Sequence, residues 1–181
     1  ELIMTSSGSL RDQDIAWVVG DAVRIDRENR RVTLGDGRSL DWESLIVTMG
    51  AHPFLPPVPG FDKGGVCVLR WIDDARELLR RVPTARRCIC IGGGLLGLEA
   101  AGALAGRGLD VTVLEGHGWL LPRQLAEPAG RLLQLHLEGL GVKVRNHARA
   151  TELTGGADVE GVRLKDGTEM EADLVVVATG V

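Results

Sequence analysis

The sequence has no tyrosine and few other aromatic residues, with only two phenylalanines and four tryptophans among its 181 residues. The missing tyrosine excludes the short-chain dehydrogenases, because those enzymes need a catalytic tyrosine. The four histidines show no metal-ligand spacing, so we expect no metal site. A formal net charge of −4 argues against nucleic-acid binding as the primary role.

Cysteine is also scarce, since Cys67, Cys88 and Cys90 are the only three and no Cys-x-x-Cys motif is present. An odd number without that spacing argues against a disulfide framework and favours a reducing compartment, so we expect a cytoplasmic protein. Cys88 and Cys90 stand two residues apart in an apolar run, so in a strand their side chains share one face. We predict that they are buried apolar residues rather than redox or metal-binding groups.

Signals for export or membrane insertion are missing as well. The sequence does not open with the positively charged, apolar leader of a secreted protein, although its first residue is Glu1 and the natural start can lie upstream. Residues 89–106 are nearly uncharged over the length of a membrane span, but they contain Glu99 and a cluster of glycines. A strand followed by a helix explains this segment better, so we expect no membrane segment.

What the sequence does contain is glycine, and one glycine motif organises the chain. The apolar run 88–91 predicts a buried strand, and Gly92, Gly94 and Gly97 follow it in a Gly-x-Gly-x-x-Gly pattern that opens an apolar helix. Gly92 would permit a sharp exit from the strand, Gly94 would let backbone approach a pyrophosphate, and Gly97 would let the helix pack closely. This strand, turn and helix predict a dinucleotide-binding site.

Two further features belong to the predicted site. The backbone N–H groups of Leu95 and Leu96, in the first helical turn, would face the phosphates at the positive end of the helix dipole. A strand predicted over residues 110–114 ends in Glu115, 23 residues after Gly92 (115 − 92). A carboxylate at about that distance accepts hydrogen bonds from the adenosine ribose in dinucleotide-binding folds. A glycine-rich turn in a general α/β domain, with a solvated Glu115, is the alternative.

One pattern of residues occurs twice, 130 positions apart. A hairpin and strand between Val32 and Gly50 match those between Val162 and Gly180, which indicates a duplicated unit. Chance similarity between two hairpins is the alternative. Since the second copy follows a glycine loop, the first copy should follow one as well, and the offset places that loop before residue 1. The six identical pairs are Val32/Val162, Leu34/Leu164, Asp36/Asp166, Gly37/Gly167, Val47/Val177 and Gly50/Gly180.

The predicted fold class is α/β. We expect a Rossmann-like NAD-binding domain over residues 69–181, with a parallel sheet, helices and a β-meander. A β-rich fragment of an FAD-binding domain of the same fold would precede it over residues 1–68. Residues 51–60 hold four of the seven prolines and are interpreted as a stiff connector. Other predicted elements are strands over 16–19, 21–25, 30–34, 45–48 and 142–144, and helices over 73–81 and from Pro128 to Gly141.

These features resemble the FAD- and NAD(P)H-dependent pyridine nucleotide oxidoreductases of the glutathione-reductase fold, in which an NAD domain is inserted into an FAD domain of the same topology. The resemblance covers nearly the whole chain and depends on residues 92–101, 111–115 and 177–181 and on the proline connector. Within this family, the segments 53–60 and 119–125 are most similar to the reductase module of nitrite reductase large subunits. Rubredoxin and ferredoxin reductases are similar as well.

The resemblance implies that NAD(P)H binds at the glycine loop and passes hydride to FAD, while the protein supplies orientation and electrostatics. Glu99 matches the family's glutamate beneath the nicotinamide, for which an ordinary acid on a helix face is the alternative. Gly180 matches the backbone that passes close to the nicotinamide. Glu115 predicts a preference for NADH over NADPH, because a carboxylate pairs with ribose hydroxyls and repels a 2′-phosphate. The alternative is that His117 or Arg123 neutralises that phosphate.

For FAD, the resemblance implies contacts in the first copy of the repeat. The backbone around Val23 would meet the adenine, and the turn from Thr48 to Gly50 would lie near the flavin. Met49 departs there from the family's usual Ala-Thr-Gly. Because the FAD phosphate loop would lie upstream, we expect the 181-residue chain alone to bind no FAD tightly and to lack reductase turnover. We also expect it to self-associate through its N-terminal segment or to be disordered there.

The electron acceptor is expected outside these residues. A nitrite reductase needs siroheme and iron–sulfur sites, whose cysteine motifs this sequence does not contain. We therefore expect such groups in additional domains or in a separate electron acceptor. A redox-silent nucleotide sensor with the same fold is the alternative to an enzyme module, and the sequence upstream of Glu1 would discriminate between the two.

Overall fold

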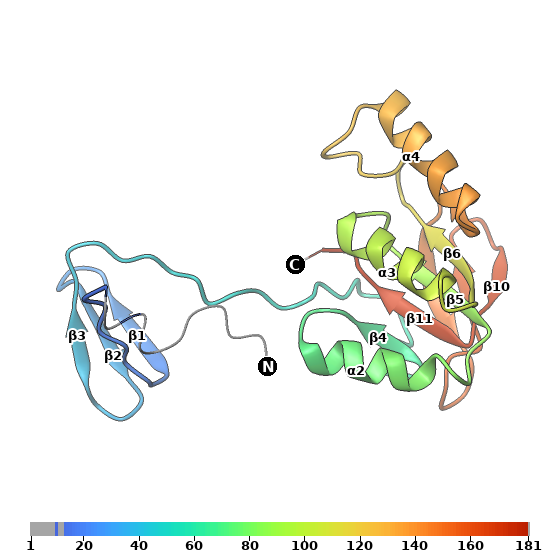
Figure 1. The fold of residues 1–181 in the computed structure, drawn as a ribbon. Coiled ribbons are helices and arrows are strands. Elements are labelled where there is room, and N and C mark those ends of the chain that lie inside the picture. The colour runs from blue at the N-terminus through green and yellow to red at the C-terminus, as the bar shows by residue number, and fades with distance from the viewer. Residues whose placement is uncertain (1–9, 11–12, 181) are drawn as a thin grey trace. The chain divides into compact units, whose positions relative to one another are not determined.

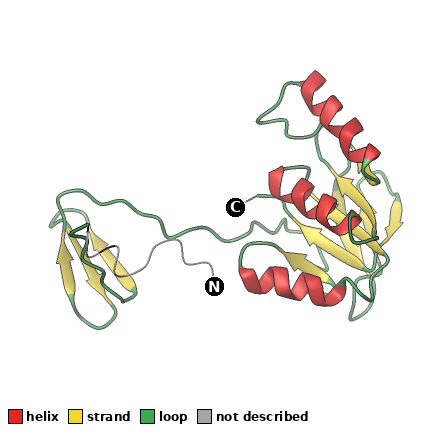
Figure 2. Ribbon diagram, viewed as in Figure 1, coloured by secondary structure: helices red, strands yellow, loops and turns green. Residues whose placement is uncertain are grey.

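The computed structural model describes residue 10 and residues 13–180, and these form two compact units (Figures 1 and 2). The first unit ends at Met49 and the second begins at Gly50. The connector 51–60 and the strand β4 (Val66–Val68) therefore belong to the second unit, although both precede the domain boundary predicted between residues 68 and 69. The sequence did not predict β4, which is only three residues long.

The second unit is built on a five-stranded parallel sheet. Its spatial order is β4, β11 (Leu174–Val177), β5 (Arg87–Ile91), β6 (Asp110–Leu114) and β7 (Val142–Arg145). Three helices connect these strands, and they are α2 (Ile72–Arg81), α3 (Leu95–Ala105) and α4 (Glu127–Gly139). Parallel strands need such crossovers because their ends lie at opposite edges of the sheet. The predicted α/β class is confirmed.

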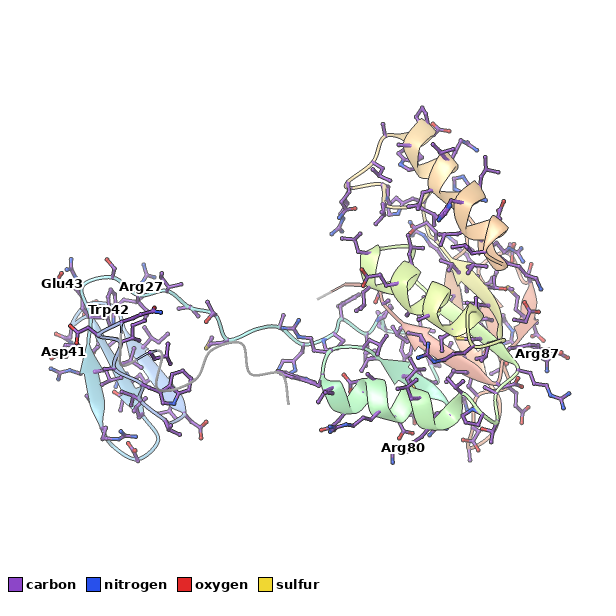
Figure 3. All side chains as sticks on the ribbon, viewed as in Figure 1. Arg27, Asp41, Trp42, Glu43, Arg80 and Arg87 are labelled. Carbon is purple, nitrogen blue, oxygen red and sulfur yellow. The ribbon has the colours of Figure 1, made fainter. Side chains whose placement is uncertain are left out.

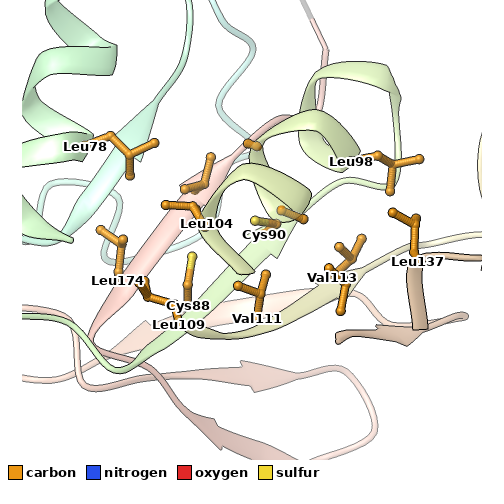
Figure 4. Close-up of a cluster of buried hydrophobic side chains, with 14 of the residues drawn as sticks. Leu78, Cys88, Cys90, Leu98, Leu104, Leu109, Val111, Val113, Leu137 and Leu174 are labelled. Atoms are coloured by element: carbon orange, nitrogen blue, oxygen red, sulfur yellow. The ribbon is translucent and has the colours of Figure 1, made fainter. Parts of the chain in front are cut away.

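One face of this sheet packs against the helices, and Figure 4 shows the apolar cluster between them. Residues alternate between the two faces of each strand, so Cys88 and Cys90 of β5 point toward Leu98 and Leu104 of α3. All three cysteines are buried and free. A hydrogen bond with Cys90, together with burial, raises the pKa of the Cys88 thiol. These side chains are therefore packing residues, as predicted, and Cys88 carries no reactive thiolate.

The opposite face of the sheet is covered by the predicted β-meander. Ile89 and Ile91 of β5 pack there against Leu153 and Val162, each of which is at most 1% exposed. Figure 1 shows the meander behind the sheet and α2 and α3 in front of it. The unit thus has three layers, and the sheet is buried on both faces. The meander comprises β8 (Ala150–Thr154), β9 (Gly161–Leu164) and β10 (Glu169–Glu171) in antiparallel order β10-β9-β8.

Acidic residues fix the start of β5. The backbone N–H groups of Arg86 and Arg87 donate to Asp173 Oδ2 at 2.9 and 2.8 Å. The Arg87 side chain also pairs with Glu171 of β10, and Figure 3 shows Arg87 at this edge of the unit. Burial raises the pKa of Asp173, but the two backbone hydrogen bonds and the Arg87 charge outweigh it, so the pKa lies below its usual value. The carboxylate therefore ties β5 to β11.

The described part of the first unit is a three-stranded meander of β1 (Ala22–Asp26), β2 (Arg31–Leu34) and β3 (Ser39–Asp41). Arg31 Nε donates to Asp41 at 2.7 Å, and Figure 3 shows Asp41 and Trp42 at the end of this sheet. Leu34 is the only buried hydrophobic side chain among the described residues of this unit.

The hairpin of the first unit repeats that of the second in detail. The carbonyl oxygen of Leu34 accepts a hydrogen bond from Gly37 N at 3.0 Å, and Leu34 N donates to the carbonyl oxygen of residue 38 at 2.8 Å. Leu164 makes the same two hydrogen bonds, with Gly167 and residue 168, at the same distances. Both glycines have positive φ, +89° and +84°. The strands that precede the two hairpins, β1 and β8, each carry a β-bulge opposite the last two residues of the strand that follows. The structure therefore supports the duplication that the sequence indicated.

The strands predicted over residues 16–19 and 45–48 are not formed, so these predictions were wrong. Residues 45–48 correspond to β11, which hydrogen-bonds with β4 on one side and β5 on the other. The described part of the first unit contains no parallel strand that could pair with them, and Val47 is 51% exposed, whereas Val177 is 3% exposed. A strand needs a partner to satisfy its backbone groups, and apolar content alone does not form one.

Candidate functional site

The glycine loop begins where β5 ends, and tertiary contacts leave no room for a side chain at two of its positions. A Cβ atom on Gly92 would lie 2.4 Å from the carbonyl oxygen of Ala178, and the φ angle of Gly92 is +115°. A Cβ atom on Gly97 would lie 2.1 Å from the carbonyl oxygen of Gly92. Gly92 therefore allows β5 to approach the end of β11, and Gly97 allows α3 to pack on the loop.

Gly94 differs from these two glycines because nothing lies within 4 Å of a Cβ atom built on it. Its φ and ψ, −81° and 175°, are extended values that any residue adopts, so backbone conformation does not require glycine here. Gly94 is the N-cap of α3 and supplies no side chain to the N–H groups of the first turn. The open space above Gly94 thus leads directly to the free donors near Leu95 and Leu96, which suits a phosphate group.

Glu115 follows β6 and is 6% exposed, the only buried charged side chain among the described residues. Its Oε2 accepts a hydrogen bond from Gly93 N at 3.0 Å. Its Oε1 accepts one from His117 N at 2.8 Å and also lies 2.8 Å from His117 Nδ1. These contacts hold the carboxylate at the glycine loop, where we predicted it. A Cβ atom on Gly93 would lie 2.6 Å from Oε2, so a larger residue there would displace the carboxylate.

The glycine loop and Glu115 line a pocket of about 590 Å³ in the second unit. The connector forms one wall through Phe54, Pro56 and Val58. Two arginines line the pocket near Glu115, Arg123 from the segment before α4 and Arg149 from the segment before β8. The pocket therefore combines apolar walls, free backbone donors and charges of both signs, as sites for dinucleotides and other small molecules do.

The connector is attached to the segment that follows β11. Phe54 N donates to the carbonyl oxygen of Gly180 at 2.9 Å, and Thr179 Oγ1 donates to the carbonyl oxygen of Phe54 at 2.7 Å. Gly180 has a φ of +120° and lines the pocket. These two bonds place Phe54 beside Gly180, the residue predicted to pass close to the nicotinamide.

The remaining predicted residues do not line this pocket. Glu99 is exposed in the second turn of α3. Val23 lies in β1 and Thr48 near the end of the first unit, and both are exposed. Gly50 is exposed at the start of the second unit and has a φ of +75°. Leu95, Leu96 and Gly97, in the first turn of α3, do not line it either. The structure thus brings together Gly92, Gly94, Glu115 and Gly180, and the binding roles of all the predicted site residues stay predictions.

Sequence reasoning missed several residues of the pocket. Gly93 looked like a spacer in the motif, yet its N–H group orients Glu115. His117 was predicted only as a group that, like Arg123, could neutralise a 2′-phosphate, and its hydrogen bonds to Glu115 were missed, although its position two residues after Glu115 could have suggested them. Phe54 and Arg149 are distant in sequence from the glycine loop, and no local signal could have placed them there.

Two structural observations bear on other kinds of site. Among residue 10 and residues 13–180, no helix combines the length and apolar character that crossing a bilayer requires. Within the same residues, no group of three or more His, Cys, Asp or Glu side chains is placed to hold a metal ion.

Comparison with known proteins places this site in a family. The model of the pyridine nucleotide-disulphide oxidoreductase family matches residues 5–181. The chain is 43% identical over 159 residues to the nitrite reductase [NAD(P)H] of Bacillus subtilis, covering 88% of this chain and 20% of that protein. It is 33% identical over 184 residues to the large subunit of the nitrite reductase (NADH) of Escherichia coli, covering 100% of this chain and 22% of that protein. The chain thus spans about a fifth of the length of these curated relatives.

Among solved structures, a ferredoxin reductase from Rhodopseudomonas palustris is similar with a TM-score of 0.89 and 31% identity. The similarity covers 99% of this chain and 45% of that one.

Proposed function

Since the chain belongs to the pyridine nucleotide-disulphide oxidoreductase family, we propose that its second unit binds NADH in a flavin-dependent electron-transfer enzyme. The observation that carries this proposal is the pocket in which Gly92, Gly93 and Gly94 meet the carboxylate of Glu115. The proposed cofactors, NAD(P)H and FAD, are those of this family.

In this proposal, different residues of the pocket bind different parts of the dinucleotide. The first-turn N–H groups of α3 hold the pyrophosphate, and Gly94 lets it approach the backbone. Glu115 accepts hydrogen bonds from the adenosine ribose while Gly93 and His117 fix its carboxylate. Gly180 carries no Cβ atom and so leaves room for the nicotinamide. When both cofactors are bound, the nicotinamide supplies a hydride and the flavin accepts it.

We propose that Glu99 orients the nicotinamide from α3, and that Val23, Thr48 and Gly50 contact FAD in the intact protein. All four are exposed in the described residues and therefore available for a ligand. A cytoplasmic location remains a proposal that rests on the three free cysteines.

Calorimetric titration of the 181-residue chain with NADH tests this function. We expect stoichiometric NADH binding. If FAD is added in excess and then removed by desalting, we expect no bound flavin and no NADH oxidation, because these residues contain a single Gly-x-Gly-x-x-Gly motif. We also expect light scattering to show self-association, because the first unit exposes apolar side chains such as Trp17 (69%) and Ile46 (86%). A yellow monomer that oxidises NADH would contradict this assignment of the cofactors.

At pH 8, Glu115 should make the chain prefer NADH to NADPH by roughly a hundredfold, since two close like charges in a partly desolvated site repel by a few kcal/mol. Replacing Glu115 with glutamine keeps the size of the side chain and removes its charge, so the NADPH penalty should fall at least about tenfold. Calorimetry with both cofactors on both chains measures this change. An unchanged ratio in the glutamine variant would show that Glu115 does not select the cofactor.

We propose that the electrons pass to a nitrite-reducing centre in additional domains of the whole protein. The support is the higher identity to the nitrite reductase of Bacillus subtilis (43%) than to the ferredoxin reductase structure (31%). An electron carrier of the rubredoxin or ferredoxin kind is the second candidate, favoured by the TM-score of 0.89 to that reductase. Steady-state assays of the whole protein with nitrite and with an oxidised ferredoxin would distinguish the two acceptors.

A further inference from the structure

The helix α4 is apolar on more of its surface than its packing within the second unit uses. It lies on β7, the edge strand of the parallel sheet, and Figure 1 shows it on the opposite side of the unit from α2. Gly130 and Leu137 are buried, and Leu133 packs partly against the core. One such apolar face is what a helix needs in order to cover a sheet. Leu132 and Leu135 lie outside that face and are 69% and 65% exposed.

These two leucines belong to an apolar stripe with the spacing of a coiled-coil seam. The stripe consists of Pro128, Leu132, Leu135 and Gly139, which follow at intervals of four, three and four residues and so share one side of the helix. All four are exposed. Contiguous exposed apolar residues mark an interaction surface. A groove of about 700 Å³ on this helix is lined by Leu125, Ala129, Leu132, Leu133, Leu135 and His136.

One flank of the apolar stripe carries two charges of opposite sign. Arg131 pairs with Glu127 through Nε and Nη2, and its side chain remains 63% exposed. Glu138 accepts a hydrogen bond from Gln134 at 2.8 Å and forms no ion pair with any residue that the structure describes. Since seven residues make about two turns, Arg131 and Glu138 lie on the same flank. The flank therefore presents a guanidinium near its start and a carboxylate near its end.

A second copy of the same helix fits the apolar stripe when the two helices run antiparallel. In that arrangement Leu132 of each copy lies opposite Leu135 of the other, and these two layers form the centre of the contact. The outer layers place Pro128 opposite Gly139. Nothing lies within 4 Å of a Cβ atom on Gly139, so the proline ring has space there. Each copy thus covers the exposed leucines of the other and removes their apolar surface from water.

The charges fit the same arrangement. A two-fold axis makes an interface self-complementary, so the charged flank of one antiparallel helix faces the charged flank of the other. Arg131 of each copy then lies opposite Glu138 of the second copy, in two equivalent contacts. The other flank carries Ala129 and His136, so a parallel pair would give Arg131 no acidic partner. Charges beside a coiled-coil seam set the orientation of the partner, and here they favour the antiparallel one.

We propose that the apolar stripe of α4 and its charged flank bind a second copy of the chain in an antiparallel two-fold dimer. With 13 residues the helix is about 20 Å long. It therefore supplies less than the roughly 800 Å² per partner of a standard interface, and we expect a weak dimer with a dissociation constant on the order of 100 µM. None of the contact residues lines the pocket of the glycine loop, so this inference goes beyond NADH binding and does not depend on it.

Charge reversal tests the contact, because the geometry predicts which variants bind each other. In Arg131→Glu both contacts set a glutamate against Glu138, and in Glu138→Arg both set an arginine against Arg131. Each variant alone should therefore dimerise roughly tenfold more weakly than the wild-type chain. An equimolar mixture of the two should recover the wild-type affinity, since both contacts then join opposite charges. Sedimentation equilibrium of the 181-residue chains at low salt measures these constants, and circular dichroism checks that both variants fold.

An alanine substitution tests the apolar part of the contact. Leu135→Ala removes half of both central layers and should weaken the dimer at least about tenfold. Leu79→Ala is the matched control, because Leu79 is also an exposed leucine (49%) on a helix, α2, and it should dimerise as the wild-type chain does. The exposed side chains of the first unit are identical in every chain. Association through that unit is therefore common to all samples, and the differences isolate α4.

Two results would overturn the inference. The first is a mixture of the charge variants that associates no more strongly than either variant alone. The second is equal association of Leu135→Ala and Leu79→Ala. NADH titration of the same preparations reports on the proposed function separately, so failure of the dimer contact leaves that function intact.

Discussion

Replacing Gly94 with valine is expected to weaken NADH binding by about a hundredfold, or about 2.7 kcal/mol, while the second unit remains folded. The valine side chain would occupy the open space through which the pyrophosphate reaches the first-turn N–H groups of α3. The fold should tolerate it, because φ and ψ of Gly94 are extended and nothing lies within 4 Å of the new Cβ atom. As an N-cap, valine should cost less than about 1 kcal/mol relative to glycine.

Calorimetric NADH titration and thermal unfolding of the same preparation measure the two parts of this prediction. Gly102→Val is the matched control, because Gly102 lies on α3, also has nothing within 4 Å of its Cβ position, and does not line the pocket. That variant should bind NADH with the affinity of the wild-type chain. Full affinity in Gly94→Val, with an unchanged melting temperature, would mean that the loop has a structural role only.

Gly97→Ala should lower the stability of the second unit, in contrast to Gly94→Val, which should lower only the affinity for NADH. The loss of stability should be large although only one methyl group is added. The new Cβ atom would lie 2.1 Å from the carbonyl oxygen of Gly92 and 3.3 Å from the Ala178 Cβ atom. Both neighbours belong to the packed junction of β5, β11 and α3, so α3 must move. Overpacking of this kind costs up to about 3 kcal/mol. For a chain of this size, that loss lowers the melting temperature by roughly 10 °C.

Thermal and urea unfolding measure this loss directly. Gly102→Ala makes the same chemical change on the same helix, with nothing near the added methyl group. It should be neutral or stabilising by up to about 1 kcal/mol, because alanine favours a helix over glycine. If both alanine variants unfold at the same temperature, the close approach of Gly97 to Gly92 does not contribute to stability.

Much of the candidate site could be predicted because its signals are local. The strand 88–91, the glycine loop and the helix after it are consecutive in sequence, and their pattern of residue types is specific to that arrangement. Glu115 could be placed because one crossover helix separates it from the loop, and a right-handed crossover returns the chain beside the first strand. The hairpin turns at Gly37 and Gly167 could also be predicted, because the residue preferences of such turns are short-range.

Other predictions failed or were missing because they depended on distant partners. Residues 45–48 have the apolar composition of β11 but form no strand, since β11 exists through its hydrogen bonds to β4 and β5. The strand β4 was not predicted, although Val175 pairs with Val66, because three residues give too weak a local signal.

The sequence by itself determined the family of the second unit, its α/β class and the position of the glycine loop, since these depend on residue types at fixed local spacing. The tertiary structure alone decided which side chains surround that loop. It brought Phe54 to Gly180 across 126 residues (180 − 54), placed Arg149 beside Gly116, and set the Glu115 carboxylate between Gly93 and His117. The physical reason is that a parallel sheet gathers the ends of distant strands at one edge, and the cofactor selectivity of the site depends on the charges that meet there.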